Sequence, residues 1–181
     1  PKNSLKSKFC IRGRKLLYDF CESNSIWNIR CGKLLIAKNN QNDQLISIYK
    51  NAISNGIKNI KIIDNKDINN YEPEIYGDIG LFIESSGILS VHDLMNALYR
   101  ISYNSNHDYL FNNLVDQIIK INNGYKIIIN NTNGGKEVVT TEWVINCAGL
   151  YSDLIAHKID QKINFPKLIF SKGCYFKLSS S

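Results

Sequence analysis

The stretch Trp143–Asp153, which reads WVINCAGLYSD, decides the fold that we expect for this chain. Its first five residues are typical of a buried strand, and a helix is predicted to begin at Ser152. Between them, Ala148 and Gly149 carry almost no side chain, so a ligand could approach the backbone and the positive end of the helix dipole. The stretch therefore predicts either a cofactor site at the carboxyl end of a strand or tight packing of a helix on that strand.

Upstream of this stretch, hydrophobic periodicity predicts helices and strands in mixed order. Helices are expected at residues 9–23, from Asp43 to a stop at Gly56, from Asp64 to a break before Pro73, and from Ser90 onward; strands are expected at 31–37, 57–63 and 80–84. The last helix would open on a capping box. In it, the Ser90 hydroxyl accepts from the Asp93 amide, and the Asp93 carboxylate accepts from the Ser90 amide.

Beyond residue 109 the hydrophobic period changes to that of strands. Three strands are expected at 114–121, 125–130 and 136–141, joined by turns at Asn122-Asn123-Gly124 and Asn133-Gly134-Gly135. A helix over 152–159 and strands around Ile169 and at 175–178 complete the chain. The order predicts an α+β (mixed α/β) protein in which residues 143–159 form one strand–helix unit.

Composition excludes several classes of protein. The chain has 181 residues, of which 44% are hydrophobic and 21% charged, enough for one core or two small lobes. No apolar run reaches the roughly 20 residues that a membrane span needs, so we expect a soluble, cytoplasmic protein. The net charge of +6 comes mostly from scattered lysines, which argues against nucleic-acid binding.

Motifs that carry chemistry are scarce. The five cysteines form no C-x-x-C pair and the three histidines lack ligand spacing, so no metal site and no disulfide framework are expected. The eleven glycines never occur two apart, which excludes G-x-G-x-x-G. Glu72 and Glu74 flank Pro73 in a pattern more typical of a solvated helix end than of an acid–base pair. No catalytic residue can be named from residue chemistry alone.

Six blocks occur in order along nearly the whole chain: SLK at 4–6 with Cys10 and Gly13, RCGKLLIA at 30–37, YEPE at 71–74, SSGILSVHDLM at 85–95, NCAGLYSD at 146–153 and KGCYF at 172–176. These blocks resemble the motifs of FAD-dependent oxidoreductases of the D-amino-acid-oxidase type. Within that superfamily they are most similar to the branch of L-2-hydroxyglutarate dehydrogenases and oxidases.

The resemblance implies the middle part of a two-lobed flavoprotein, with the mixed sheet of a substrate lobe, an FAD-domain β-meander and one strand–helix unit. It divides the chain into an FAD-domain helix and linker (1–29), a substrate-binding lobe (30–84), part of the FAD-binding domain (85–160) and a truncated return into the substrate lobe (161–181). Family members also carry an N-terminal G-x-G-x-x-G unit and a C-terminal segment, and the sequence contains neither.

Residue roles are implied only where the blocks match. The backbone of Val115 stands at the position where the backbone of family members contacts the adenine of FAD. The flavin-side strand end corresponds to Cys147, Ala148, Gly149 and Leu150.

On the substrate side, the resemblance places Lys172 and Tyr175 on the strand that faces the substrate. Lys172 stands where the family usually has Arg. A lysine cannot bind a carboxylate through the two parallel hydrogen bonds that a planar guanidinium group donates, and this weakens the case for a dicarboxylate substrate. His92 is either a substrate-side residue near the flavin or a residue of the helix start.

The implied function is FAD-dependent oxidation of an α-hydroxy acid such as L-2-hydroxyglutarate, with glycerol 3-phosphate or amino acids as alternative substrates. An alternative of another class is a protein without catalytic activity. It would be either the remnant of a gene or an interaction lobe that binds a separate chain carrying the dinucleotide-binding (Rossmann) half of the enzyme. We expect that the chain alone does not retain FAD. We also expect self-association, most simply as a two-fold dimer, because strand edges and apolar faces would be left uncovered.

Overall fold

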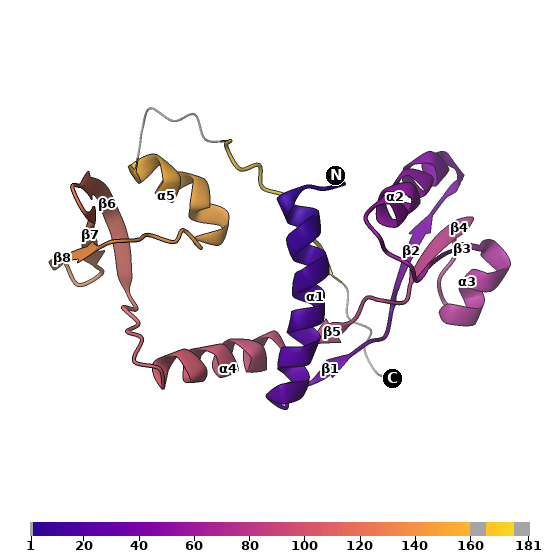
Figure 1. The fold of residues 1–181 in the computed structure, drawn as a ribbon. Helices are drawn as coiled ribbons and strands as arrows, with labels where there is room; N and C mark the ends of the chain where they lie inside the picture. The colour runs from indigo at the N-terminus through magenta and orange to yellow at the C-terminus, as the bar shows by residue number, and fades with distance from the viewer. Residues whose placement is uncertain (1, 160–165, 176–181) are drawn as a thin grey trace. The chain divides into compact units, whose positions relative to one another are not determined.

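The computed structural model describes residues 2–159 and 166–175, and it divides the chain into two compact units (Figure 1). Unit 1 is Pro1–His107 and unit 2 is Asp108–Ser181. Each unit combines helices with small antiparallel sheets, which confirms the expected mixed α/β class.

A three-stranded sheet forms one lobe of unit 1. Its order is β2 (Lys33–Ala37), β4 (Ile79–Ile83), β3 (Ile60–Asp64), and both pairings are antiparallel, so the expectation of a mixed sheet is wrong. The connection after β2 leads to β3 at the opposite edge of the sheet, so these two strands run in the same direction, and β4 enters between them antiparallel to both. A short 3-10 turn, η1 (Asn39–Gln41), precedes the helix in this connection.

Two helices cover the two faces of this sheet. Helix α2 (Asn42–Ser54) packs on one face, where Leu45 and Leu81 are buried with Ala37 and Ile60. Helix α3 (Asn65–Tyr71) packs on β3 and β4, and its last residue places its ring 4.5 Å from that of Phe82, on the opposite face. The sheet is therefore buried on both sides, which explains why its strands read as apolar runs.

The remaining helices of unit 1 share a second, smaller core. Helix α1 (Leu5–Ser23) and helix α4 (Val91–Tyr103) bury Cys21, Ile26 and Ala97 between them. A two-stranded ribbon that the sequence pattern did not predict, β1 (Asn28–Ile29) with β5 (Ile88–Leu89), connects them. Strands of two residues leave too little alternation for a pattern to be detected.

Helix caps decide several boundaries. The Asp64 carboxylate accepts the N–H groups of Lys66 and Asp67 at 3.0 Å, which confirms the predicted start of α3. Ser90 accepts the Asp93 amide at 3.3 Å, but its own amide donates to the Trp27 carbonyl at 2.9 Å. The predicted second half of the capping box is therefore wrong, because the β1–β5 ribbon takes that donor.

Unit 2 is built on a three-stranded meander. Strands β6 (Asn113–Ile121), β7 (Gly124–Asn131) and β8 (Lys136–Thr141) pair in that order, as predicted, with a bulge between Val115 and Gln117. Ile118 and Ile129 are buried on the same face of the sheet. A 3-10 turn, η2 (Gly149–Tyr151), leads into helix α5 (Ser152–Ile159), which packs against β6.

The strand predicted at Trp143–Cys147 does not form, and its expected burial is wrong. Trp143 is 81% exposed and Ile145 85% exposed, and the segment runs as an irregular connection from β8 to α5 (Figure 1). A strand requires a neighbour for its backbone hydrogen bonds, and none of the strands in residues 2–159 pairs with this segment. Its composition favours a strand, but the described residues supply no partner for it.

The strand expected around Ile169 is also wrong, since residues 166–175 have no regular structure and Ile169 is 95% exposed. The strand expected at 175–178 lies mostly outside the described residues. Among the helices that are described, none combines the length and the apolar character needed to cross a membrane.

Candidate functional site

The segment Cys147–Leu150 presents open backbone at the start of η2. Gly149 has φ +55°, and a Cβ built on it would have no neighbour within 4 Å. Ala148 is half-buried, whereas Cys147 and Leu150 are exposed. A planar group could therefore approach the peptide units of this turn without meeting side chains, as the two small residues predict.

Asn146 fixes the conformation of this turn. Its side-chain amide donates to the Ser152 carbonyl at 2.7 Å, and its Oδ1 accepts the Ala148 amide at 3.2 Å. The Tyr151 amide donates to the Ala148 carbonyl at 3.0 Å. Asparagine can satisfy both a donor and an acceptor of the backbone in this way. The block NCAGLYSD therefore includes a structural residue to which the sequence reasoning gave no role.

Asp153 ties the first turn of α5 to the segment that follows the helix. Its carboxylate accepts the Leu154 amide at 2.8 Å and the Leu168 amide at 3.1 Å. The hydrogen bond from Leu168 lowers the pKa of this carboxyl below its ordinary value of 3.8, with smaller lowering effects from its own backbone amide, that of Leu154 and the charge of His157. Asp153 is therefore ionised at neutral pH and can hold both amides.

Val115 lies half-buried on β6, beside the bulge residue Asp116. The Asp116 carbonyl accepts a hydrogen bond from Lys158 Nζ of α5 at 2.7 Å, and Lys136 Nζ of β8 lies 3.9 Å from its carboxylate. Lys158 thus ties α5 to the bulge, whereas Lys136 lies at the limit of ion-pair distance with a mostly exposed side chain and contributes little. Val115 and the Cys147–Leu150 turn belong to the same unit, and α5 connects them because it follows the turn and packs on β6.

The substrate-side candidates lie in different units. His92 is exposed in the first turn of α4, in unit 1, whereas Lys172 and Tyr175 are exposed in the irregular segment of unit 2. The Tyr175 ring lies beside the backbone of Gly173. The structure does not gather these three side chains into one cluster within a unit.

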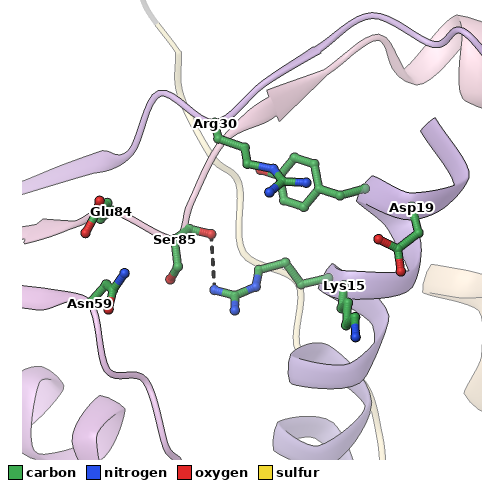
Figure 2. Close-up of a pocket in the computed structure, with 8 residues that line it drawn as sticks. Lys15, Asp19, Arg30, Asn59, Glu84 and Ser85 are labelled. Carbon is green, nitrogen blue, oxygen red and sulfur yellow. Dashed lines mark hydrogen bonds between the residues drawn. The ribbon is translucent and has the colours of Figure 1, made fainter. Parts of the chain in front are cut away.

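Sequence reasoning missed a polar cavity of about 530 Å³ in unit 1 (Figure 2). Helix α1 supplies half of its wall and the loops beside β3 and β4 supply most of the rest. The lining residues are Arg14, Lys15, Tyr18, Asp19, Arg30, Asn59, Glu84 and Ser85.

Two arginines in the wall of this cavity are fixed by contacts with neighbouring residues. Arg14 donates to the Ser85 carbonyl at 3.1 Å (dashed line in Figure 2). Arg30 stacks 4.5 Å from the centroid of the Tyr18 ring and forms an ion pair with Glu22 at 2.7 Å. Because Arg30 is paired with Glu22 outside the lining, the wall keeps the cations Arg14 and Lys15 and the anions Asp19 and Glu84, so the cavity can take a small polar molecule but presents no dominant charge.

A signal for this cavity exists in the sequence. Arg14 and Tyr18, like Lys15 and Asp19, are four residues apart and therefore share one polar face of α1. The prediction of α1 used only its apolar stripe. The contributions of Asn59 and Glu84, which lie far away in sequence, could not be predicted without the fold.

The residues present fit one part of a dinucleotide cofactor. The open backbone at Gly149 and the braced bulge beside Val115 suit contacts with flat rings through peptide groups. The chain contains no G-x-G sequence to cradle a diphosphate. Within the described ranges 2–159 and 166–175, no cluster of three or more His, Cys, Asp or Glu side chains is arranged to hold a metal ion.

Comparison with protein families gives a match along the whole chain. The family described as "FAD dependent oxidoreductase" matches residues 1–181. Among curated proteins, the mitochondrial L-2-hydroxyglutarate dehydrogenase of Bos taurus is 29% identical over 185 residues, covering 97% of this chain and 39% of that protein. The L-2-hydroxyglutarate dehydrogenase of Escherichia coli strain K12 is 29% identical over 177 residues, covering 97% and 40%.

Solved structures share the fold at low sequence identity. Glycine oxidase from Geobacillus kaustophilus superposes with a TM-score of 0.72 at 17% identity, covering 87% of this chain and 44% of that one. L-proline dehydrogenase from P. horikoshii gives a TM-score of 0.70 at 15% identity, covering 86% and 41%. The chain thus spans about 40% of the length of the curated relatives that it matches.

Proposed function

The chain belongs to the FAD-dependent oxidoreductase family, and on that premise we propose that it supplies the middle portion of an enzyme that oxidises an α-hydroxy acid. The observation that carries the proposal is the match over residues 1–181, which includes the turn at Asn146–Gly149. The named curated relatives act on L-2-hydroxyglutarate, which makes this acid the first candidate substrate.

Within such an enzyme, unit 2 would hold part of the cofactor. FAD, when bound, supplies the acceptor for a hydride from the substrate carbon. The backbone of Val115 would contact the adenine, and Cys147, Ala148, Gly149 and Leu150 would contact the flavin side through peptide groups. Asn146 and Lys158 would keep these two segments in the conformation that receives the cofactor.

The chain alone should not retain FAD. Each backbone hydrogen bond contributes on the order of 1 kcal/mol net. Immobilising a free ligand costs roughly 4–15 kcal/mol, which a few such bonds cannot offset. Most of the affinity would have to come from a diphosphate cradle, and this sequence has none.

The identity of the substrate depends on Lys172. A lysine offers a single mobile charge where an arginine would hold a carboxylate through two bonds. Lys172 therefore remains compatible with a monocarboxylate or a phosphate, and glycerol 3-phosphate and amino acids are the alternative substrates.

A second candidate function is that of an interaction lobe for a separate polypeptide that carries the dinucleotide-binding half. The exposure of Trp143 and Ile145 favours it, since large apolar side chains with more than four-fifths of their surface in solvent are typical of faces that another chain covers. This reading requires no catalytic activity of the complex.

The test is to read the coding sequence on both sides of residues 1–181, and to express the whole frame together with any neighbouring frame that encodes G-x-G-x-x-G. With FAD and a dye acceptor, we expect L-2-hydroxyglutarate to reduce the dye faster than glycerol 3-phosphate or amino acids do. The Lys172→Arg variant should lower KM for the dicarboxylate. A bound, reducible flavin with turnover only of amino acids would overturn the hydroxy-acid assignment.

A further inference from the structure

We propose that Asn133 is a site of spontaneous modification, at which the side-chain amide is lost and aspartate or isoaspartate is formed. Asparagine followed by glycine is especially prone to this reaction, because glycine has no side chain to hinder attack by its own amide nitrogen. The sequence contains three such pairs, at 55–56, 123–124 and 133–134. They lie at the end of α2 and in the two turns of the meander (Figure 1), and the structure distinguishes them. The inference goes beyond the proposed function and does not depend on it.

The reaction needs only the chain and water. The Gly134 nitrogen attacks Cγ of Asn133, so a bond between that nitrogen and Cγ forms, the Cγ–Nδ2 bond breaks, and ammonia leaves with the proton of the Gly134 amide. The product is a five-membered succinimide ring. Water then opens the ring at either carbonyl carbon, which gives aspartate or isoaspartate, and nothing is oxidised or reduced.

The turn between β7 and β8 leaves the side chain of Asn133 available for this reaction. The residue is exposed, and its main-chain amide donates to Asn131 Oδ1 at 2.8 Å, but within the described residues no group hydrogen-bonds to its side chain. A Cβ built on Gly134 would have no neighbour within 4 Å, so the peptide group that must move has room. One hydrogen bond must break first, because the Gly134 amide donates to the Asn131 carbonyl at 2.9 Å.

Asn55 is protected at the end of α2. Its side-chain Nδ2, which is the group that would leave, donates to the carbonyl and to Oδ1 of Asn51 at 2.7 and 3.1 Å. The attacking amide of Gly56 is also occupied, since it donates to the Ile53 carbonyl at 2.9 Å. Each hydrogen bond that must break slows the reaction by about fivefold. Asn55 should therefore react more than tenfold slower than Asn133.

Asn123 is protected by the sheet around Gly124. The turn has only two residues, so Gly124 already belongs to β7 and pairs with Ile121 of β6. On its other side, a Cβ built on Gly124 would run into the Thr141 carbonyl of β8. The peptide group that must rotate is therefore held between two strands, whereas Gly134 lies between the paired residues of β7 and β8 and outside both strands. The fold thus favours Asn133 among three pairs of the same sequence.

Peptide mapping of the 181-residue chain tests the proposal. Trypsin cleaves after lysine and separates the three pairs into the peptides 51–58, 121–126 and 127–136. The chain is kept at mildly alkaline pH in water enriched in ¹⁸O, so a residue that reacts during the incubation carries the heavy oxygen and is distinguished from one that reacts during digestion. We expect label at Asn133 to appear at least about fivefold faster than at Asn55 or Asn123.

Two variants and one change of solvent isolate the cause. Gly134→Ala should slow the reaction at Asn133 at least tenfold, because a methyl group hinders the attack; the strain of alanine at φ +90° would loosen the turn and act in the opposite direction. Gly135→Ala is the matched control, since its methyl group would meet only the Asn131 Cβ, at 3.8 Å, and it should leave the rate unchanged. In concentrated urea the three pairs should react at similar rates, because the hydrogen bonds of the fold are lost.

Equal rates for the three pairs in the native chain overturn the proposal, and so does faster labelling at Asn55 or Asn123. A rate at Asn133 that Gly134→Ala does not lower overturns it as well, because water would then attack the side chain directly, without the glycine amide. Slower labelling in Gly135→Ala would assign the effect to a general change in the turn and would also contradict the proposed attack.

Discussion

Strand β4 and the segment Trp143–Cys147 have similar β-forming composition and opposite environments. Leu81 of β4 is fully buried between two paired strands and helix α2. Ile145 of the other segment is 85% exposed, with no strand beside it in the described chain. The difference teaches that a segment of β-forming composition becomes a strand only where a neighbouring strand is present to take its backbone hydrogen bonds.

Truncating the central side chain of each region, Leu81 and Ile145, should give the largest difference in the free energy of unfolding. Leu81→Ala leaves a cavity in the core of unit 1 and should cost about 3 kcal/mol of unfolding free energy. Ile145→Ala removes a side chain that is already in solvent, and should cost almost nothing in the monomer. Urea unfolding of the 181-residue chain at low protein concentration measures both. Equal costs would contradict the comparison and would mean that the 143–147 segment is buried in solution.

Glycine substitutions in the turns of the meander should give the next largest loss of stability. Gly124 has φ +130°, and a Cβ there would run into the Thr141 carbonyl, so Gly124→Ala should cost about 2 kcal/mol. Gly134 has φ +90° with nothing within 4 Å of a Cβ, so Gly134→Ala should cost about 1 kcal/mol. Thermal unfolding ranks the two. The opposite order would mean that β8 is not held against the first turn as described.

Removing helix caps should cost less stability, and it compares the starts of two helices within unit 1, α3 and α4. Asp64→Ala removes two hydrogen bonds at the start of α3 and should cost about 1 kcal/mol. Ser90→Ala removes one longer bond at the start of α4 and should cost about half as much. Asp64→Asn is the control, because asparagine also caps well. A cost for Asp64→Asn equal to that of Asp64→Ala would assign the effect to charge rather than to capping.

The smallest effect should be a pH dependence in unit 2. The pKa of Asp153 is lower in the folded chain, so its contribution is complete above pH 3.8 and is lost as the pH falls through its folded pKa. Below that point, the Leu168 amide should lose its acceptor and exchange with solvent faster. The protection factor of this amide, followed by hydrogen exchange as the pH is lowered from 5, measures the change. Asp153→Asn, which cannot titrate, should show no such step beyond intrinsic exchange.

Much of the fold could be predicted from the sequence because its signals are local. The apolar stripe of α2, the cap at Asp64 and the asparagine–glycine turn before Gly124 each need only a few neighbouring residues. The meander followed from alternation and turn chemistry. The ribbon of β1 and β5 was missed because two-residue strands show no period.

The candidate site was only partly predictable, for physical reasons. The small residues Ala148 and Gly149 indicated open backbone, and Gly149 has it. The role of Asn146 depends on a turn geometry that spacing does not specify. The cavity beside Arg14 joins residues 71 positions apart, and long-range contacts of this kind appear only when the fold is known.

The most direct test of the central claim is whether this chain holds FAD by itself. Gly149 presents open backbone, but the sequence has no diphosphate cradle, and none of the described strands lies beside residues 143–147. The chain would be purified with excess FAD, passed through gel filtration and examined by visible absorption. We expect a colourless protein with no flavin band. A yellow protein that keeps stoichiometric flavin after filtration would contradict the account.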